Sequence, residues 1–502
     1  MSAPAPKRPK RVVIAGGGTA GWVAATALVR QLGELVQVTL VESDAIGAIG
    51  VGESTVPTAR AFHEFLKIDE RAFMSATLAT FKLGISFEGW GREGDRYIHS
   101  FGTMPLRTWT ADFQHFWLEA RSRGEAADIG AYYLEHEAAR LHKMDLSSQP
   151  KLSYSYQLDA TLYSRFLRRI AENDGCVRRE GKIAGVDRHP ESGDIAALVM
   201  EDGTRIAGDL FLDCTGFRSM LVGQELETPF EDWLHWLPCD SAWATQLENR
   251  GDYHPYTRCI THGAGWEWRI PLQHRMGSGF VFSSEHLNAE EGKAQFLDSL
   301  GEAPLRDPRL VRFRAGRRRD PWVRNCVAIG LADGFVEPLE STAIHLIMIG
   351  VTRLLQLFPF GEDMEGQRTR YNEMARSEIE RIRDFVILHF HLTERDDTRF
   401  WNYVRTMSVP DSLRERIEAF AEGAIAWQSV EEIFRVDSWI QVCLGQRLTP
   451  KSWHRLGALL PEGRLKRELE EVRLRIERAV QAMPTHQQFV ERYAPGAAAP
   501  TA

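Results

Sequence analysis

The 502-residue sequence has few cysteines, no basic-then-apolar leader and no long uninterrupted apolar run. Its six cysteines are scattered without a C-x-x-C pair, which argues against a disulfide framework or a zinc site and predicts reduced thiols in a cytoplasmic protein. The most apolar stretch, residues 343–358, is interrupted by Thr352 and Arg353 and is too short to span a bilayer. We therefore expect a buried core helix there and no membrane association.

An excess of positive charge is also absent, because the formal net charge is −8. This balance argues against nucleic acid as a partner. The one basic cluster, residues 317–319, is interpreted as a solvated segment beside a strand. His389 and His391 have no third ligand at a convincing spacing, so no metal site is predicted.

A glycine turn near the start of the chain is the strongest local signal. Residues 12–14 read as a buried parallel strand, and Gly16, Gly18 and Gly21 follow at G-x-G-x-x-G spacing. Such glycines permit the sharp turn, the approach of backbone to a pyrophosphate and the packing of helix on strand. Glu42 ends the second strand about 20 residues on, where a carboxylate accepts a hydrogen bond from a ribose hydroxyl. The sequence therefore predicts dinucleotide binding.

Later segments extend this nucleotide domain. Residues 43–58 form a loop with three glycines, which we interpret as a strap over the cofactor, with an ordinary flexible connection as the alternative. Residues 195–212 read as a hairpin, whose last apolar residues return to the first sheet. Residues 326–330 form another buried strand, so the nucleotide domain is expected to be discontinuous in sequence.

The predicted fold class is α/β: a Rossmann-like nucleotide-binding domain with an antiparallel sheet and a helical C-terminal subdomain. The antiparallel sheet is expected in residues 233–300, and helical periodicity follows in three segments: 368–390, 412–427 and 464–483. We expect a disordered tail over residues 1–9, a domain over 10–360 that includes the inserted sheet, a helical subdomain over 361–493 and a second disordered tail over 494–502.

Some side chains admit two interpretations when taken alone. Lys82 lies between Phe81 and Leu83 and is either a surface lysine or an amine with a chemical role in an apolar setting. His99 and Phe101, and likewise the pair Trp266 and Trp268, share a side of an extended strand, and core packing explains both pairs. These residues alone do not decide a function.

Five motifs together resemble the flavin-dependent tryptophan halogenase family. They are, in the family's order, GGGTAGW at 16–22, GVGESTVP at 50–57, TFKLGISF at 80–87, W-x-W-x-I-P at 266–271 and EPLEST at 337–342. The resemblance covers almost the whole chain from Val12 onward. It implies a GR2-type, flavin monooxygenase-like fold and an enzyme that needs reduced FAD, O2 and a chloride or bromide ion. It also implies a separate NAD(P)H-dependent flavin reductase and, as is usual in the family, a homodimer.

The resemblance also assigns roles to residues of this sequence. Lys82 and Glu340 would be catalytic, with hypohalous acid made at the flavin and used at Lys82 to halogenate an aromatic ring. Thr342 and Ala343 would hold the halide, Trp266 and Trp268 would shield the flavin, and His99, Phe101 and Trp439 would contact the substrate. For FAD the implied residues are Gly16, Gly18, Thr19, Ala20, Gly21, Glu42, Ser43, Ile46, Glu53, Ile183, Leu331 and Ile344.

The chain departs from the family pattern at two places. Phe335, Pro338 and Ser341 fit F-x-x-P-x-x-S-x-G, but the last position is Ala343, which leaves the choice between chloride and bromide open. The Tyr-Tyr and Glu cluster that holds the amino-acid group of tryptophan has no clear counterpart, so an indole-type substrate without that group is expected. A flavin-dependent aromatic monooxygenase and a non-catalytic flavoprotein that binds a partner are the alternative functions.

Overall fold

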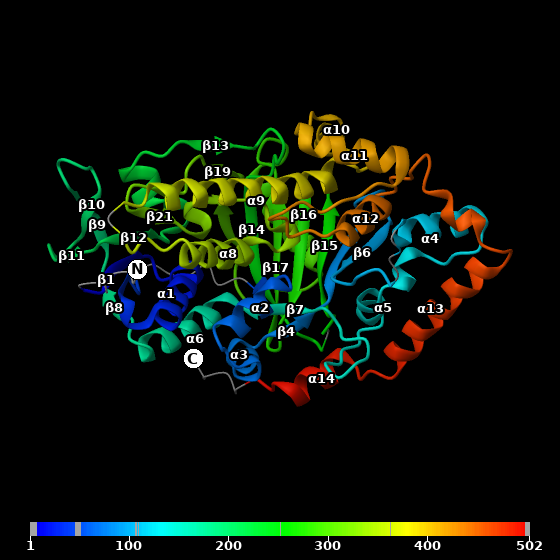
Figure 1. Cartoon of the computed structure of the whole chain (residues 1–502), viewed down its shortest axis with the longest axis horizontal. Helices are drawn as coiled ribbons and strands as arrows, with labels where there is room; N and C mark the ends of the chain where they lie inside the picture. The colour runs from blue at the N-terminus through cyan, green and yellow to red at the C-terminus, as the bar shows by residue number, and fades with distance from the viewer. Residues whose placement is uncertain are drawn as a thin grey trace, which may run out of the picture. The chain divides into compact units, whose positions relative to one another are not determined.

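The computed structural model describes residues 8–45, 52–105, 108, 110–251, 253–361 and 363–496, which form two compact units. Unit 1 comprises Met1–Leu78, Leu158–His235 and Phe313–Glu380, and unit 2 comprises Ala79–Gln157, Trp236–Arg312 and Arg381–Ala502. Each unit is therefore built from three separate segments, whose course can be followed by colour in Figure 1.

Unit 1 is centred on a six-stranded sheet in the order β20-β21-β12-β1-β2-β8. The strands are β1 (Lys10–Ala15), β2 (Val36–Glu42), β8 (Val177–Glu180), β12 (Leu210–Asp213), β20 (Trp322–Val323) and β21 (Cys326–Ala328). All neighbours pair in parallel except β20 and β21. The predicted return of residues 210–212 to the first sheet is confirmed, because Val12 pairs with Leu210.

Helices cover this sheet and hold the glycine turn in place. The helices of unit 1 are α1 (Thr19–Leu32), α2 (Thr58–Phe65), α3 (Glu70–Thr77), α6 (Ala160–Asn173) and α8 (Ala343–Gln356), and α9 (Glu365–His391) begins in it. Helix α1 packs against α6 and α8, as Figure 1 shows. The most apolar segment of the sequence is the buried helix α8, as predicted.

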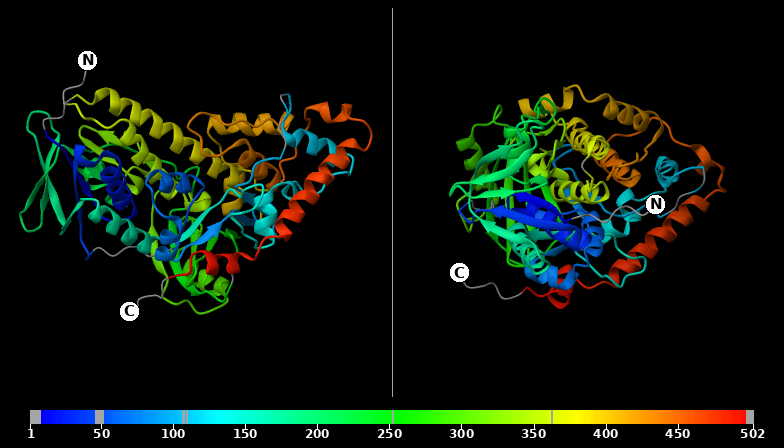
Figure 2. Two further views of the ribbon diagram at one scale, coloured as in Figure 1. Left: turned by 60° about the horizontal axis from the view of Figure 1, so that its bottom comes forward. Right: turned by 60° about the vertical axis from the view of Figure 1, so that its left-hand side comes forward.

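Two small sheets complete unit 1. One is the hairpin sheet of β9 (Ile183–Arg188), β10 (Ile195–Met200) and β11 (Arg205–Ala207), which projects from the unit in Figures 1 and 2. The other joins β13 (Phe230–Asp232), β19 (Gly316–Arg318) and β22 (Gly334–Phe335). The hairpin predicted within residues 195–212 is confirmed, because β10 pairs antiparallel with β11.

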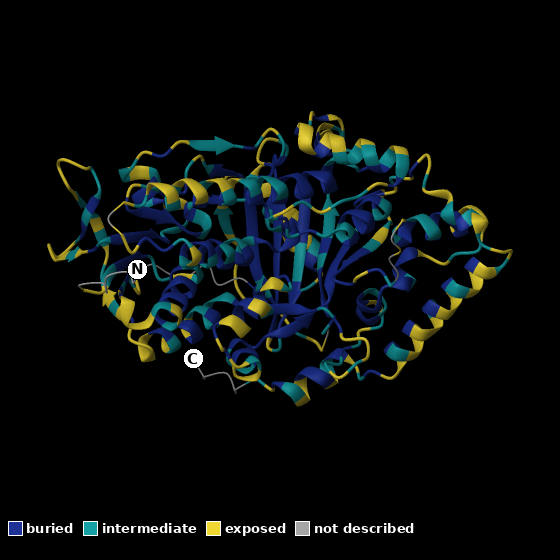
Figure 3. Ribbon diagram, in the orientation of Figure 1, coloured by how far each residue is buried: buried dark blue, intermediate teal, exposed yellow. Residues whose placement is uncertain are grey.

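Unit 2 contains a seven-stranded sheet in the order β18-β14-β17-β16-β15-β5-β6. The strands are β5 (Gly84–Glu88), β6 (Arg96–Ser100), β14 (Ser241–Glu248), β15 (Tyr256–His262), β16 (Gly265–Pro271), β17 (Arg275–Phe282) and β18 (Arg309–Arg312). Only β5 and β15 pair in parallel, so the predicted antiparallel sheet is confirmed. Figure 3 shows how deeply these strands are buried, and β17 is buried along its whole length.

Short strands and helices surround this sheet. β4 (Thr80–Lys82) pairs antiparallel with β7 (Ser155–Asp159), whereas the short strand β3 (Gly52–Ser54) belongs to unit 1. The helices are α4 (Phe113–Ser122), α5 (Leu134–Arg140), α7 (Ala289–Leu300), α10 (Arg399–Thr406), α11 (Asp411–Gly423), α12 (Val436–Gly445), α13 (Arg464–Gln481) and α14 (His486–Tyr493). In the part of the chain that the structure describes, no helix is long and apolar enough to cross a membrane.

Two local expectations are corrected by the structure. Arg317 is not solvated, because it is only 4% exposed and its guanidinium contacts Glu231 at 2.8 Å and Glu380 at 3.0 Å. The helix expected over residues 412–427 ends at Gly423, because Ala424 takes a left-handed conformation with φ of 55°. The partners of Arg317 come from segments distant in the sequence, and the carbonyl oxygen of Ala424 accepts a hydrogen bond from Gln114 of α4 at 3.2 Å.

Candidate active site

The glycine turn of unit 1 has the geometry that dinucleotide binding requires. Gly16 has φ of 106°, and a Cβ built on it would lie 2.3 Å from the carbonyl oxygen of Cys214. A Cβ on Gly21 would lie 1.9 Å from the carbonyl oxygen of Gly16, so only glycine lets α1 pack this closely. Around Gly18 no described heavy atom lies within 4 Å of the corresponding position. The backbone is thus open where a phosphate would lie, at the N-terminus of α1.

Glu42 lies beside this turn at the end of β2. Its Oε2 atom would be 1.6 Å from a Cβ built on Gly17, and it accepts a hydrogen bond from Trp22 Nε1 at 3.3 Å. Its Oε1 atom accepts from Arg178 Nε at 2.6 Å. These contacts fix the carboxylate against the glycine turn. Ser43 follows directly after β2, whereas Ile46 lies outside the described residues.

The turn after β21 lies against the same end of α1. A Cβ built on Gly330 would be 3.2 Å from Ala20 Cβ, so the short helix η5 (Gly330–Ala332), which contains Leu331, adjoins the first turn of α1. Thr19 Oγ1 lies 3.3 Å from Ser164 Oγ of α6. Ile183 lies at the start of β9, where it packs on a buried cluster that includes Val13 and Phe211.

A strained turn directs α8 in unit 1. The short helix η6 (Pro338–Glu340) is followed by Ser341, whose φ of 60° is left-handed, and α8 then begins at Ala343. Left-handed non-glycine residues are costly and gather at functional sites. Ala343 itself is helical, so alanine fits there without backbone strain.

The start of α8 fits an anion. Its first turn has no acidic residue, and the side chain of Thr342, the residue that precedes the helix, does not cap it. Thr342 is 1% exposed, and among the described residues its Oγ1 atom finds no hydrogen-bond partner. Buried hydroxyls are nearly always hydrogen-bonded, so this atom and the main-chain N–H groups at the N-terminus of α8 suit a bound halide or cofactor. Ile344 follows in the same turn and is buried.

Two carboxyl groups of unit 1, those of Glu53 and Asp333, have a raised pKa. Burial raises the pKa of Glu53, in β3, to about 7. Burial also raises the pKa of Asp333 to about 7, although Arg317, Arg353 and Arg318 oppose the shift. Ser54 Oγ lies 2.6 Å from Ser341 Oγ, which links β3 to the strained turn. Glu340, at the end of η6, is 1% exposed.

Lys82 ends β4 in unit 2 and is fully buried. Its Nζ atom lies 5.5 Å from the centre of the Phe101 ring. The surface-lysine interpretation is therefore wrong. An amine held against an aromatic ring in a buried setting suits chemistry on an aromatic compound.

Two of the predicted substrate residues of unit 2, His99 and Trp439, are part of a cluster of packed aromatic rings. His99, in β6, is 1% exposed, and Trp439, in α12, is 3% exposed. Their rings are connected through Phe385, whose centre lies 5.6 Å from that of His99 and 5.0 Å from that of Trp439. Phe434 stacks on Phe385 at 3.8 Å. We call His99, Phe385, Phe434 and Trp439 the aromatic group.

Trp266 and Trp268 lie on one face of β16, as their alternation predicted. Their ring centres are 6.2 Å apart. Trp268 pairs with Gly279 of β17, where a Cβ would lie 2.1 Å from the indole. Glycine at this position lets the ring lie across the neighbouring strand.

A parallel sheet with a glycine turn at a helix N-terminus, followed by an acid at the end of the second strand, defines a dinucleotide-binding protein. Residues 11–462 match the model of the tryptophan halogenase family. The tryptophan 6-halogenase SttH of Streptomyces toxytricini is 37% identical over 440 residues, which are 82% of this chain and 84% of that protein. The chain belongs to the tryptophan halogenase family and is a flavin-dependent halogenase.

Solved structures agree with this assignment. A flavin-dependent halogenase from Xanthomonas campestris has a TM-score of 0.96 and 49% identity, over 98% of this chain and 100% of that one. BrvH, a flavin-dependent halogenase from Brevundimonas sp. BAL3, has a TM-score of 0.92 and 41% identity, over 97% of this chain and 100% of that one. The predicted family, fold class and enzyme class are confirmed, and the protein uses a flavin and a halide.

Sequence reasoning missed several residues of these sites. Asp333 could have been found, because it is an acid in the turn directly after a buried strand. Phe385 and Phe434 carried no such signal, since they lie in segments far apart in the sequence and meet only in the folded unit.

Proposed function

We propose that the protein binds reduced FAD from a separate NAD(P)H-dependent flavin reductase and halogenates an indole-type aromatic compound with chloride or bromide. When reduced FAD is bound, it supplies two electrons, so that one ring C–H, one halide ion, O2, FADH2 and one proton become the halogenated ring, FAD and two waters. The residues named below would bind, orient and use the groups involved.

The residues of unit 1 fit the two anionic groups. The open backbone at Gly18 and the N-terminus of α1 would hold the pyrophosphate, and Glu42 would accept a hydrogen bond from a ribose hydroxyl. Thr342 and Ala343 would hold the halide through main-chain N–H groups, with the buried Thr342 hydroxyl as a further donor. Trp266 and Trp268 would keep the flavin separate from the organic substrate.

The observation that carries the proposal is the complete burial of Lys82 with its amine 5.5 Å from the Phe101 ring. Lys82 would hold and direct the oxidised halogen, either as a haloamine or as a protonated hydrogen-bond donor. Glu340 would stabilise the cation formed on the ring or accept its proton. His99, Phe101 and Trp439 would contact the aromatic ring.

We infer that the substrate lacks a free amino-acid group. SttH is named a tryptophan 6-halogenase, but in this chain Phe385 packs against the Trp439 ring, and the charged groups beside that ring, Arg416 and Glu432, pair with each other. An ammonium and a carboxylate that enter such surroundings without partners lose their hydration. Indole should therefore be preferred to tryptophan.

The test supplies equimolar indole and tryptophan with O2, reduced FAD from an added reductase and either bromide or chloride. We expect halogenated indole as the main product by mass spectrometry. Predominant halogenated tryptophan would contradict the substrate assignment while keeping the reaction. A hydroxylated product without halogen would instead favour a monooxygenase.

A further inference from the structure

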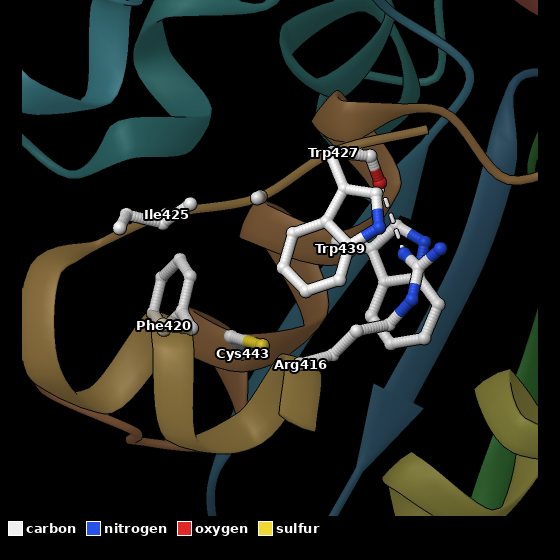
Figure 4. A pocket seen from close by; sticks show the side chains of 7 residues that line it. Arg416, Phe420, Ile425, Trp427, Trp439 and Cys443 are labelled. Carbon is white, nitrogen blue, oxygen red and sulfur yellow. Dashed lines mark hydrogen bonds between the residues drawn. The ribbon is translucent and has the colours of Figure 1, made fainter. Parts of the chain in front are cut away.

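Arg416 of α11 lies between two tryptophan rings of unit 2. Its Cζ atom is 4.2 Å from the centre of the Trp439 ring and 4.7 Å from that of Trp427, and Figure 4 shows the guanidinium beside both indoles. Its Nη1 atom donates to the carbonyl oxygen of Trp427 at 2.9 Å. A planar guanidinium can stack on indole faces and donate hydrogen bonds in its own plane at the same time.

A single carboxylate connects this arginine to Trp439. Glu432 Oε2 accepts from Arg416 Nη2 at 2.8 Å, and Glu432 Oε1 accepts from Trp439 Nε1 at 2.9 Å. The main-chain N–H of Ser429 also donates to Glu432 Oε2, at 2.7 Å. The Glu432 side chain has no exposed surface, and that of Arg416 is 11% exposed. The indole of Trp439 is thus held both at its face and at its N–H.

The backbone of Trp439 is fixed separately from its ring. Gln441, in the same helix, accepts hydrogen bonds from Ser100 N at 3.0 Å and Ser100 Oγ at 2.9 Å. Ser100 is next to His99 in β6, so α12 is anchored to the strand that carries a predicted substrate residue. Loss of Arg416 would leave this anchor intact and change the orientation of the ring alone.

A small pocket, shown in Figure 4, is lined by Phe420, Ile425 and Cys443 together with Arg416 and both indoles. The lining of this pocket is mainly apolar, and the packing beside the two indoles is therefore incomplete.

We propose that Arg416 is a positioning residue that, through Glu432, sets the tilt of Trp439 in the aromatic group and thereby the orientation of the bound substrate. The inference rests on the proposed function, because it takes Trp439 as a substrate contact. Arg416 and Glu432 neutralise each other, so neither is available to recognise an ammonium or a carboxylate. This arrangement selects a planar, uncharged aromatic substrate.

The test compares Arg416→Lys with Arg395→Lys in the full-length enzyme. Lysine keeps the positive charge but cannot stack as a plane between two rings. Arg395 is the matched control, because its Cζ lies 4.6 Å from the Trp401 ring and its guanidinium pairs with Asp397 at 2.6 Å. The measurements are KM and kcat for indole, the ratio of halogenated isomers, and free hypohalite trapped with a dye in the absence of indole.

We expect Arg416→Lys to raise the KM for indole about tenfold and to change the isomer ratio, with hypohalite formation unchanged. Arg395→Lys should match the wild type in all three measurements. An unchanged KM and isomer ratio in Arg416→Lys, or equal changes in both variants, would overturn the inference. If the wild type halogenates no indole, the proposed function fails instead.

A second variant covers the case in which Arg416→Lys does not fold. Trp427→Leu removes the outer ring of the stack and leaves the pairing of Glu432 with Arg416 in place. We expect a smaller shift of the isomer ratio in the same direction. An isomer ratio identical to that of the wild type would contradict the role of the stack.

Discussion

Lys82 combines full burial with a basic side chain, which is rare for lysine. If Lys82 handles the oxidised halogen, Lys82→Ala should lower the rate of ring halogenation by about 10²–10⁴-fold, the usual effect of losing a positioned donor or proton-transfer group. FAD binding, O2 consumption and hypohalite formation should stay unchanged. Halogenated indole by mass and hypohalite trapped with a dye, measured together, check this prediction.

The matched control for Lys82 is Lys293→Ala. Lys293 Nζ also lies near an aromatic ring, 5.4 Å from the centre of Trp243, but that lysine is partly exposed. Its variant should halogenate at the wild-type rate. Near wild-type halogenation by Lys82→Ala would show that the buried amine has only a structural role.

Glu53 makes the stability of the protein depend on pH. Its pKa is about 7 in the folded state and 4.5 in the usual reference, so between these values the folded protein keeps a proton that the unfolded chain releases. The free energy of unfolding should therefore fall as pH rises from about 4.5 to 7, by up to about 3 kcal/mol. Glu53→Gln cannot ionise and should flatten this dependence.

Urea unfolding at several pH values checks the effect of Glu53. Some slope should remain in Glu53→Gln, because Asp333 also has a pKa of about 7. Glu201→Gln, at an exposed turn of the hairpin sheet, is the control and should keep the wild-type slope. A slope in Glu53→Gln equal to that of the wild type would contradict the prediction.

Helix α8 is joined to α9 by a buried polar network. His345 Nε2 lies 2.7 Å from Glu378 Oε1, His345 Nδ1 lies 2.9 Å from Thr58 Oγ1, and Arg353 donates to Glu378 Oε2. Burial alone would raise the pKa of Glu378, but His345 and Arg353 outweigh it and hold that pKa below its usual value. This carboxylate therefore stabilises the helix whose start carries Thr342 and Ala343.

Glu378→Gln should destabilise the protein by about 3–5 kcal/mol, because it leaves the buried Arg353 without a carboxylate. Glu468→Gln breaks an exposed pair with Arg464 in α13, so its cost should be below about 1 kcal/mol. Chemical unfolding of both variants, with halide affinity measured alongside, distinguishes them. Equal stabilities would mean that the network does not support α8.

Elements with local signals were predictable from the sequence, and those set by distant contacts were not. The strand, glycine turn and helix of residues 10–32 follow from an apolar run and three spaced glycines, and the structure has them where expected. The apolar spacing of residues 157–175, by contrast, predicts a helix over that whole segment, but α6 begins at Ala160 and Gln157 lies in β7, where it pairs with Thr80 of β4. That pairing joins segments far apart in the chain, which periodicity within one segment cannot reveal.

The same distinction holds for the candidate site. The family motifs located Lys82, Glu340 and the start of α8, because each motif is a short continuous segment. The position of Arg416 between Trp427 and Trp439 depends on how α11 and α12 pack against each other. No sequence pattern within either helix predicts this position. Contacts between side chains of different helices can be identified only from the folded structure.

At the scale of the whole molecule, G-x-G-x-x-G spacing occurs at Gly16, Gly18 and Gly21 and again at Gly89, Gly91 and Gly94. The second run lies between the antiparallel strands β5 and β6 and is not followed by a helix, so only the first has the strand, turn and helix of a dinucleotide fingerprint. NADH would need a second such turn, or a substitute for it, to reach the flavin. We therefore expect that NADH alone does not reduce FAD bound to this protein. Flavin absorbance, followed without oxygen after NADH is added, checks this prediction.

Addition of a catalytic amount of a separate flavin reductase to the same sample is the internal control for the NADH experiment. The absorbance should then bleach, because free flavin reduced by that enzyme exchanges with the bound flavin. Rapid bleaching before the reductase is added would show a hydride-transfer site on this chain. The proposal that reduced FAD is delivered by a separate enzyme would then be wrong, whereas halide and substrate binding, which rest on Thr342 and Lys82, would be unaffected.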